Sequence, residues 1–195
     1  MSRWPNISTI AARPSRDRAP AQQTGRRAPS IGAAALAGAL ATYGMDVAGR
    51  TLVAPALRMK PPGNLGRWIG HMLQGRFTHE DITKAAPVAH EATIALTAHY
   101  AIGVVLGAGY GLLLRVPQAR QSSLRGAPAY GIATTVLPWF WMFPARGQGV
   151  MGLRDGDLRV PAFALGTHVA YGLGIGFSLR WANSSLAQRC RSLVA

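Results

Sequence analysis

The sequence predicts an all-α protein that crosses a lipid bilayer four times. Four apolar stretches occur along its 195 residues, and each approaches the length of about 20 residues that a membrane-spanning helix needs. Three of the stretches carry an ionisable residue near the middle, namely Asp46, His99 and His168. Such residues are costly in hydrocarbon and are usually paired there. Together these observations favour a polytopic membrane protein.

The charge distribution supports the same fold class. The net charge of +14 comes from 21 Lys and Arg against 7 Asp and Glu, a balance that would first suggest nucleic acid. However, the sequence has no RNP, zinc-finger or helix-turn-helix motif, and its arginines flank the apolar stretches, as expected beside lipid headgroups. We therefore expect the bilayer and its anionic headgroups as partners, and no nucleic acid. The lone Cys190 excludes an internal disulfide framework.

The first elements are a tail and a span rich in small residues. Residues 1–30 are rich in Arg, Pro and Ser, which predicts a disordered basic tail. The first span is expected over residues 31–57, before Pro61 and Pro62. Its many Gly and Ala residues favour close contact with another helix, because membrane helices associate through such small residues.

A polar connection at residues 58–87 contains one amphipathic stripe. Its apolar residues have helical spacing and lie opposite Arg67 and His71; they are Leu65, Trp68, Ile69 and Met72. We expect a short helix lying at the headgroup level with Trp68 as its anchor. A helix packed on the bundle is the alternative. His71 and His79 are expected to be solvated or near lipid phosphates, and Arg76 is expected at the interface or in the loop.

Three further spans complete the membrane domain. The second, at residues 88–114, carries Gly103, Gly107 and Gly111, two overlapping GxxxG units that predict a helix-packing face. The third, at 127–144, should bend at Pro138, which is followed by a cluster of aromatic residues typical of a membrane interface. The fourth is expected at 160–181.

The domain organisation follows from these spans. We predict a tail at 1–30, a four-helix transmembrane domain at 31–182 and a basic C-terminal tail at 183–195. The two helix pairs differ in motif and loop length, so no internal repeat is predicted. The side that holds the termini has twelve Lys and Arg residues, and the opposite side has nine, Arg50 included among the nine. This bias favours cytoplasmic termini.

A family resemblance rests on short motifs that occur in order along the chain. They are Gly66-Arg67-Trp68-Ile69-Gly70-His71 with Gly75-Arg76-Phe77, then His99-Tyr100-Ala101-Ile102-Gly103, Pro138-Trp139 with Pro144, and His168 with Tyr171-Gly172-Leu173-Gly174. Over residues 30–182 the chain resembles a bacterial family of small four-span membrane proteins known only as a domain of unknown function. The resemblance implies an inner-membrane location and no established activity. The arginine-rich tail departs from the family's usual start close to the first span.

The ionisable residues in the spans are the candidates for chemistry. Asp46 and Arg50 stand four residues apart on one helix face. They could form an intrahelical ion pair, or Asp46 could accept a proton or cation from the bundle interior. Glu91, at the start of the second span, is expected near the headgroups. The candidate polar cluster comprises Asp46, Arg50, His99, Tyr100, His168 and Tyr171.

The two mid-span histidines raise the question of a cofactor. His99 and His168 lie at similar depth and could hold a metal or haem between them. The sequence has no CxxCH motif, and two histidines cannot complete a zinc site without Asp46 or Glu91. Histidines in membrane helices more often hydrogen-bond across helices. We therefore predict no cofactor and no metal site, with His99 and His168 as weak candidates.

The function expected is that of an integral inner-membrane protein that is not an enzyme. No Walker A, Rossmann, HExxH or GxSxG motif occurs in the sequence. An accessory or assembly subunit that contacts other membrane helices, or a second copy of itself, fits this pattern. Two alternatives stay open. One is a small transporter or proton-conducting protein that uses the Asp/His cluster, and the other is a haem- or metal-binding membrane protein.

Overall fold

The described part of the protein is all-helical. The computed structural model describes residues 28–61, 63–116, 123–182 and 184, and no strand occurs among them. Three of its helices are long and apolar enough to cross a membrane: Ile31–Ala56, Glu91–Leu113 and Arg159–Ala182. The tails predicted at 1–30 and 183–195, with Cys190, lie outside the described residues except for 28–30 and 184.

The first long helix is continuous but changes its hydrogen bonding near its end. Helix α1 (Ile31–Ala48) begins where the Ser30 side chain accepts from the Ala33 N–H at 3.1 Å. It continues through a π-helical turn, η1 (Gly49–Val53), into α2 (Ala54–Ala56). Pro55 has no N–H to donate, and the preceding Ala54 N–H bonds to the Gly49 carbonyl, five residues back. The proline therefore coincides with a wider turn without ending the helix.

The fourth apolar stretch, at 127–144, is helical but interrupted. Helix α6 (Ser123–Thr134) is followed by a turn at Thr135, a π-helical segment η3 (Pro138–Met142) and the short helix α7 (Phe143–Ala145). The Phe143 N–H bonds to the Pro138 carbonyl, directly before Pro144. This repeats the arrangement around Pro55. The stretch is not among the three long apolar helices, because its α-helical hydrogen bonding breaks at these prolines.

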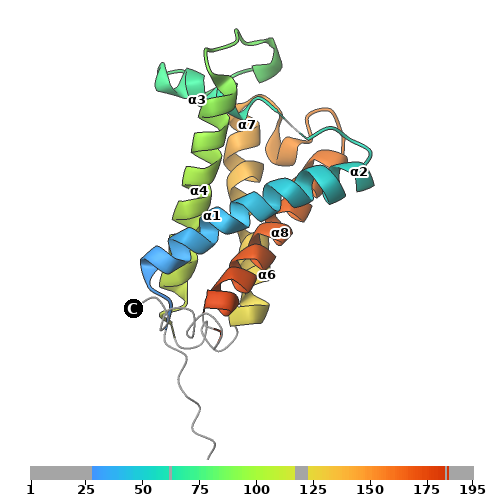
Figure 1. Cartoon of the computed structure of the whole chain (residues 1–195). Helices are drawn as coiled ribbons and strands as arrows, with labels where there is room; N and C mark the ends of the chain where they lie inside the picture. The colour runs from blue at the N-terminus through green and yellow to red at the C-terminus, as the bar shows by residue number, and fades with distance from the viewer. Residues whose placement is uncertain (1–27, 62, 117–122, 183, 185–195) are drawn as a thin grey trace, which may run out of the picture.

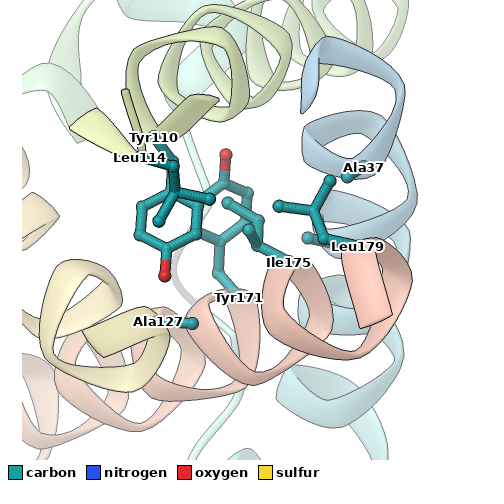
Figure 2. Close-up of a cluster of buried hydrophobic side chains, with 8 residues drawn as sticks. Ala37, Tyr110, Leu114, Ala127, Tyr171, Ile175 and Leu179 are labelled. Atoms are coloured by element: carbon teal, nitrogen blue, oxygen red, sulfur yellow. The ribbon is translucent and has the colours of Figure 1, made fainter. Parts of the chain in front are cut away.

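The long helices form one bundle (Figure 1). Helix α1 crosses α4 (Glu91–Leu113) and α8 (Arg159–Ala182), and α8 packs in turn against α6. Figure 2 shows the core that they share, in which Tyr110 and Tyr171 lie beside Ile175 and Leu179. Small residues complete this core, notably Ala37, Ala41 and Ala127. Each of the four helices therefore contributes to one buried cluster.

The α1–α4 crossing depends on glycine. A Cβ on Gly38 would lie 2.9 Å from the Cα of Gly107, and a Cβ on Gly107 would lie 2.6 Å from the Cα of Gly38. Real Cβ atoms do not approach backbone so closely, so only glycine fits at either position. Gly103 and Gly111 contact the side chains of Thr42 and Ala34 on the same face. The overlapping GxxxG units of α4 thus lie at a helix interface, as predicted.

The α6–α8 crossing has the same contacts. A Cβ on Gly131 would lie 2.9 Å from the Cα of Gly172, and it would also meet the carbonyl oxygen of His168, four residues earlier. In the α1–α4 crossing, a Cβ on Gly38 would likewise meet the carbonyl oxygen of Gly103, four residues before Gly107. Gly176 faces Ala127 as Gly111 faces Ala34. The sequence shows no repeat in motif or loop length. The packing nevertheless repeats, because a close crossing needs only a few small residues at matched spacing.

The outer faces of the long helices are apolar. On α1 the exposed residues with helical spacing are Leu36, Leu40, Tyr43 and Val47, between 43% and 62% exposed. Only 11% of the most apolar stretch of α4 is buried. A water-soluble helix would bury its large apolar residues and expose polar ones. Large apolar side chains on the outer faces, over helix crossings formed by Gly and Ala, indicate a membrane protein.

A cap of short elements covers one end of the bundle. It contains α3 (Leu65–Leu73), η2 (Ile82–Lys84) and η4 (Val150–Gly152), and α3 packs against α4. Trp68 is 1% exposed, in a cluster with Ile82 and Ala145, and its Nε1–H donates to the Phe77 carbonyl at 2.9 Å. The expected headgroup anchor is therefore buried within the protein, and α3 packs on the bundle.

Candidate functional site

Two neighbouring cavities lie between the helices below the cap. The outer cleft, of about 600 Å³, is lined by residues of α1, α3, α4 and α8, including Asp46, Arg50 and Glu91. The inner cavity, of about 160 Å³, lies deeper and is lined mostly by apolar side chains. Five residues line both, and they are Met45, Leu65, His99, Phe163 and Thr167. His99 therefore stands where the two cavities adjoin.

Asp46 pairs with His99 across the α1–α4 interface. The Nε2 of His99 lies 3.1 Å from the Oδ1 of Asp46, and both side chains are just over a quarter exposed. A carboxylate can only accept, so Nε2 carries the proton. Among the described residues Asp46 has no ion pair with Arg50, which also lines the outer cleft. The intrahelical Asp46–Arg50 ion pair, one of the two arrangements considered for Asp46, is therefore not formed.

The α8 residues of the candidate cluster lie at the inner cavity. His168 donates from Nδ1 to the Ala164 carbonyl at 2.8 Å, which leaves its Nε2 as an acceptor. Tyr171, 2% exposed, donates its hydroxyl to the Gly103 carbonyl on α4 at 2.6 Å. The tyrosine therefore links two helices, while His168 is available to a guest in the cavity.

The remaining candidates lie elsewhere or do not complete a metal site. Tyr100 lines neither cavity, and its ring stands edge-on to His99 with centroids 6.4 Å apart. Within the described residues no three His, Cys, Asp or Glu side chains are grouped closely enough to hold a metal ion. His99 and His168 line one cavity without a third ligand beside them. This arrangement offers no support for a multi-ligand metal centre.

An ion pair ties the cap to α4 at the rim of the outer cleft. Arg67 Nε donates to Glu91 Oε1 at 2.8 Å, and its Nη1 donates to the Ala85 carbonyl at 3.2 Å. The same Glu91 oxygen accepts the Val88 N–H at 3.0 Å. Glu91 is therefore a structural partner of Arg67, which fixes α3 to the start of α4.

Two histidines of the cap contact each other. His71 Nε2 lies 2.9 Å from the Ala86 carbonyl, so it carries a proton, and its Nδ1 then accepts from His79 Nε2–H at 2.7 Å. His71 is 2% exposed, so the prediction of a solvated side chain was wrong for this residue. Burial, together with the nearby His71 and Arg76, lowers the pKa of His79. Arg76 itself is exposed, as expected.

One residue of the inner cavity could not be recognised from the sequence. Arg146, directly after α7, is 4% exposed and lines the inner cavity. In the sequence it looks like any arginine that ends an apolar stretch, and nothing distinguishes it from Arg115 or Arg180. Only the fold of the cap over α7 reveals that it is buried.

The comparisons with known proteins identify a family but no function. The family described as "Protein of unknown function (DUF2938)" matches residues 35–181. The match covers every helix of the bundle and the cap between them. Neither a curated protein nor a solved structure matches the chain.

Proposed function

Since the chain belongs to the DUF2938 family of proteins of unknown function, we propose a role for it from its structure. It is a multi-pass protein of the bacterial inner membrane that crosses the bilayer four times, with both termini in the cytoplasm. It acts as a non-enzymatic accessory or assembly subunit. The observation that carries this proposal is the apolar outer surface of α1, α4 and α8, whose crossings are formed by small residues.

The fourth crossing is supported by the packing of the interrupted helix. The α6 segment crosses α8 with the same glycine contacts that join α1 to α4. At the other end, the His79 N–H donates to the Ala145 carbonyl at 2.8 Å, which brings the end of α7 to the cap. The segment from α6 to α7 thus runs from the end of α8 that lies away from the cap to the cap itself, as a further membrane span would.

Cysteine labelling tests the four-span topology. In a chain with Cys190→Ser, single cysteines replace three exposed residues, Gln74 and Asp155 at the cap and Val116 after α4. Four spans place Gln74→Cys and Asp155→Cys on the periplasmic side, where an impermeant maleimide labels intact cells. Val116→Cys should then react only after lysis. Labelling of Asp155→Cys together with Val116→Cys, or extraction of the protein by carbonate, would contradict the proposal.

An accessory role would use the outer faces of the helices. Leu36 and Leu40 of α1 are more than half exposed, and such a face can pack against another membrane helix or a second copy of this chain. The mass of the protein in detergent, measured by light scattering, tests self-association. A mass of two chains that falls to one in Leu36→Ala/Leu40→Ala would support pairing through this face. A monomer throughout leaves a different membrane protein as the partner.

Proton conduction is the second candidate, and one observation favours it. Asp46, His99 and His168 line adjoining cavities, with a hydrogen bond of 3.1 Å between the first two. Titratable groups linked across helices are the usual components of a proton relay. Reconstituted vesicles with an internal pH dye test it. Asp46→Asn and His99→Ala should abolish flux, while Tyr43→Phe on the outer face of α1 should not. Equal flux in all four proteins, the wild type included, would end this candidate.

A further inference from the structure

The inner cavity contains a buried arginine whose charge the described protein leaves unbalanced. Arg146 is 4% exposed, yet no carboxylate lies within ion-pair distance of it among the described residues. Its Nε has no hydrogen-bond partner in that part of the chain. Burial lowers the pKa of Arg146 to about 10, so the side chain stays positively charged at neutral pH. A buried charge without a counter-ion is strongly unfavourable.

The chain has few acids that could supply the missing charge. It contains seven Asp and Glu residues, and six of them lie in the described part of the chain. The carboxylates of four of those six accept hydrogen bonds elsewhere: Asp46, Asp81, Glu91 and Asp157. The other two, Glu80 and Asp155, are exposed. The seventh is Asp17, in the N-terminal region.

The contacts that Arg146 does make are weak substitutes for a counter-ion. Its Nη1 donates to the Gly63 carbonyl at a long 3.3 Å, and its guanidinium lies 5.1 Å from the centre of the Phe143 ring. A neutral carbonyl and an aromatic face hold the side chain in place without neutralising it. The guanidinium is thereby fixed at the wall of the cavity, with donors left for another group.

The other hydrogen-bond donors of the inner cavity already have acceptors. Thr42 and Thr167 donate to carbonyls of their own helices, and Tyr171 donates to Gly103. His168 has used its Nδ1 proton on Ala164. Arg146 is therefore the group in this cavity with an unmet need for an acceptor. An incoming oxyanion would find its strongest contact there, because guanidinium forms paired hydrogen bonds with carboxylate and phosphate.

The other walls of the inner cavity favour a ligand that carries an apolar chain. Its wall includes Ile102, Leu106, Leu137 and Phe163, and its volume of about 160 Å³ adjoins the larger outer cleft through shared wall residues. An oxyanion attached to a short apolar chain would satisfy both halves, with the charged end at Arg146 and the chain among the apolar residues.

We propose that the inner cavity binds the oxyanion group of an anionic amphiphile, carboxylate or phosphate, through the guanidinium of Arg146. The proposal rests on the membrane location proposed above, and it names the ligand class of this cavity. Two sources offer the same chemistry, an anionic phospholipid of the bilayer and a free short-chain carboxylate. The uncharged analogues of both, diacylglycerol and octanol, lack the oxyanion and should not bind.

Thermal unfolding of the purified full chain in a neutral detergent tests the proposal. Octanoate or phosphatidylglycerol is titrated in separate arms, with octanol and diacylglycerol as the uncharged controls. The Tm of the wild type should rise with at least one of the two anions and should not rise with the corresponding neutral compound. The anion that raises the Tm identifies the source of the ligand. No shift with either anion, or equal shifts with the neutral compounds, would overturn the proposal.

Three variants assign the effect to Arg146. Arg146→Met keeps the buried volume and removes the charge, so its half-saturating ligand concentration should rise at least about tenfold. Arg146→Lys should lie between it and the wild type, and Arg76→Met, an exposed arginine of the same cap, should match the wild type. An unchanged midpoint in Arg146→Met would refute the assignment.

The ligand-free proteins give a second readout that a packing role would not produce. If the charge is unpaired without ligand, Arg146→Met should be at least as stable as the wild type in octyl glucoside alone. A counter-ion from within the chain predicts the opposite, and Asp17→Asn would then lower the Tm as Arg146→Met does. That result would identify Asp17, and not a ligand, as the counter-ion of Arg146. The labelling experiment above is independent of ligand, so failure of the two proposals can be told apart.

Discussion

His99 Nε2 donates a hydrogen bond to Asp46 Oδ1 over 3.1 Å, between residues 53 positions apart in the chain. This contact joins α1 to α4 beside the wall that the two cavities share. The close crossing of these helices otherwise consists of glycine and alanine, with Thr42 against Gly103. The Asp46–His99 contact is therefore a polar interaction that can fix the register of α1 and α4.

The pair should contribute a modest coupling energy. Both side chains are just over a quarter exposed, so we expect about 0.5–1 kcal/mol from a double-mutant cycle of Asp46→Asn and His99→Gln. Reversible unfolding in mixed micelles measures the four proteins of the cycle. A coupling of zero would mean that the two residues act independently in the membrane domain. Tyr43→Phe, on the outer face of α1, serves as the unaffected reference.

The glycine crossings should not tolerate even one methyl group. In Gly107→Ala the new Cβ would meet the Gly38 backbone at 2.6 Å, so the helices must separate, at a cost of about 2 kcal/mol or more. Gly172→Ala should cost a similar amount, because its Cβ would lie 2.9 Å from the Cα of Pro128. The measurement is the free energy of unfolding in mixed micelles.

A matched control exists on α1 itself. A Cβ added to Gly44 would meet no atom within 4 Å, so Gly44→Ala should leave stability unchanged or raise it slightly through helix propensity. If Gly44→Ala and Gly107→Ala were equally destabilising, the close crossing would not be the cause.

The Arg67–Glu91 ion pair should hold the cap on the bundle. Glu91→Gln removes the charge that accepts from Arg67 at 2.8 Å and should cost about 1 kcal/mol. Limited proteolysis of the 74–90 connection should become faster, because α3 is less firmly fixed to α4. Asp81→Asn, which removes the partner of the exposed Lys84, is the control and should change stability little. Unaltered protease resistance in Glu91→Gln would contradict this role.

The cap should lose stability in acid through His79. Burial, then His71 and Arg76, hold the pKa of His79 below its ordinary 6.5. The unfolded chain therefore binds a proton at a higher pH than the folded one. The stability is fully present above about pH 6.5 and falls as the pH drops through the lower pKa of the folded state.

This predicts a lower Tm at pH 5.5 than at pH 7.5, with a smaller difference in His79→Gln. Differential scanning fluorimetry in detergent measures both. A pH dependence that is identical in the two proteins would assign the effect to other groups.

The long helices could be predicted from the sequence because bilayer thickness imposes a length that composition reveals. The stretches at 31–57 and 88–114 contain the helices α1 and α4, and α8 extends one residue beyond each end of the stretch at 160–181. The GxxxG units of α4 lie at an interface. The stretch at 127–144 is helical as well, but its prolines interrupt it in a way that hydropathy does not register.

The orientation of α3 could not be predicted. An apolar stripe can face lipid or protein equally well, because both are apolar surroundings, and Trp68 turned out to face protein. The partner of Asp46 was equally undetermined. Helical spacing placed Arg50 on its face, but the rotation of α1 against α4 decides which residue it meets, and that rotation depends on the whole interface.

Arg146 shows a further limit of sequence patterns. An arginine after an apolar stretch is usually at the headgroup level, and its burial depends on the segment 63–82 folding over α7. The internal match between the two helix pairs was also invisible, since it involves only a few small residues and unrelated neighbours.

The matched glycine crossings have a consequence for how this protein is made. Each consecutive pair, α1 with α4 and α6 with α8, has its own close crossing. In the proposed four-span topology, the first pair would therefore be able to leave the translocon as a packed hairpin while the ribosome still synthesises the second. The seam between the two pairs must then form afterwards. It includes the α1–α8 contact, where a Cβ on Gly174 would lie 2.9 Å from the Cα of Ala41, and the hydrogen bond from Tyr171 to the Gly103 carbonyl. Two co-expressed fragments, divided between residues 116 and 123, should reassemble in the bilayer through that seam.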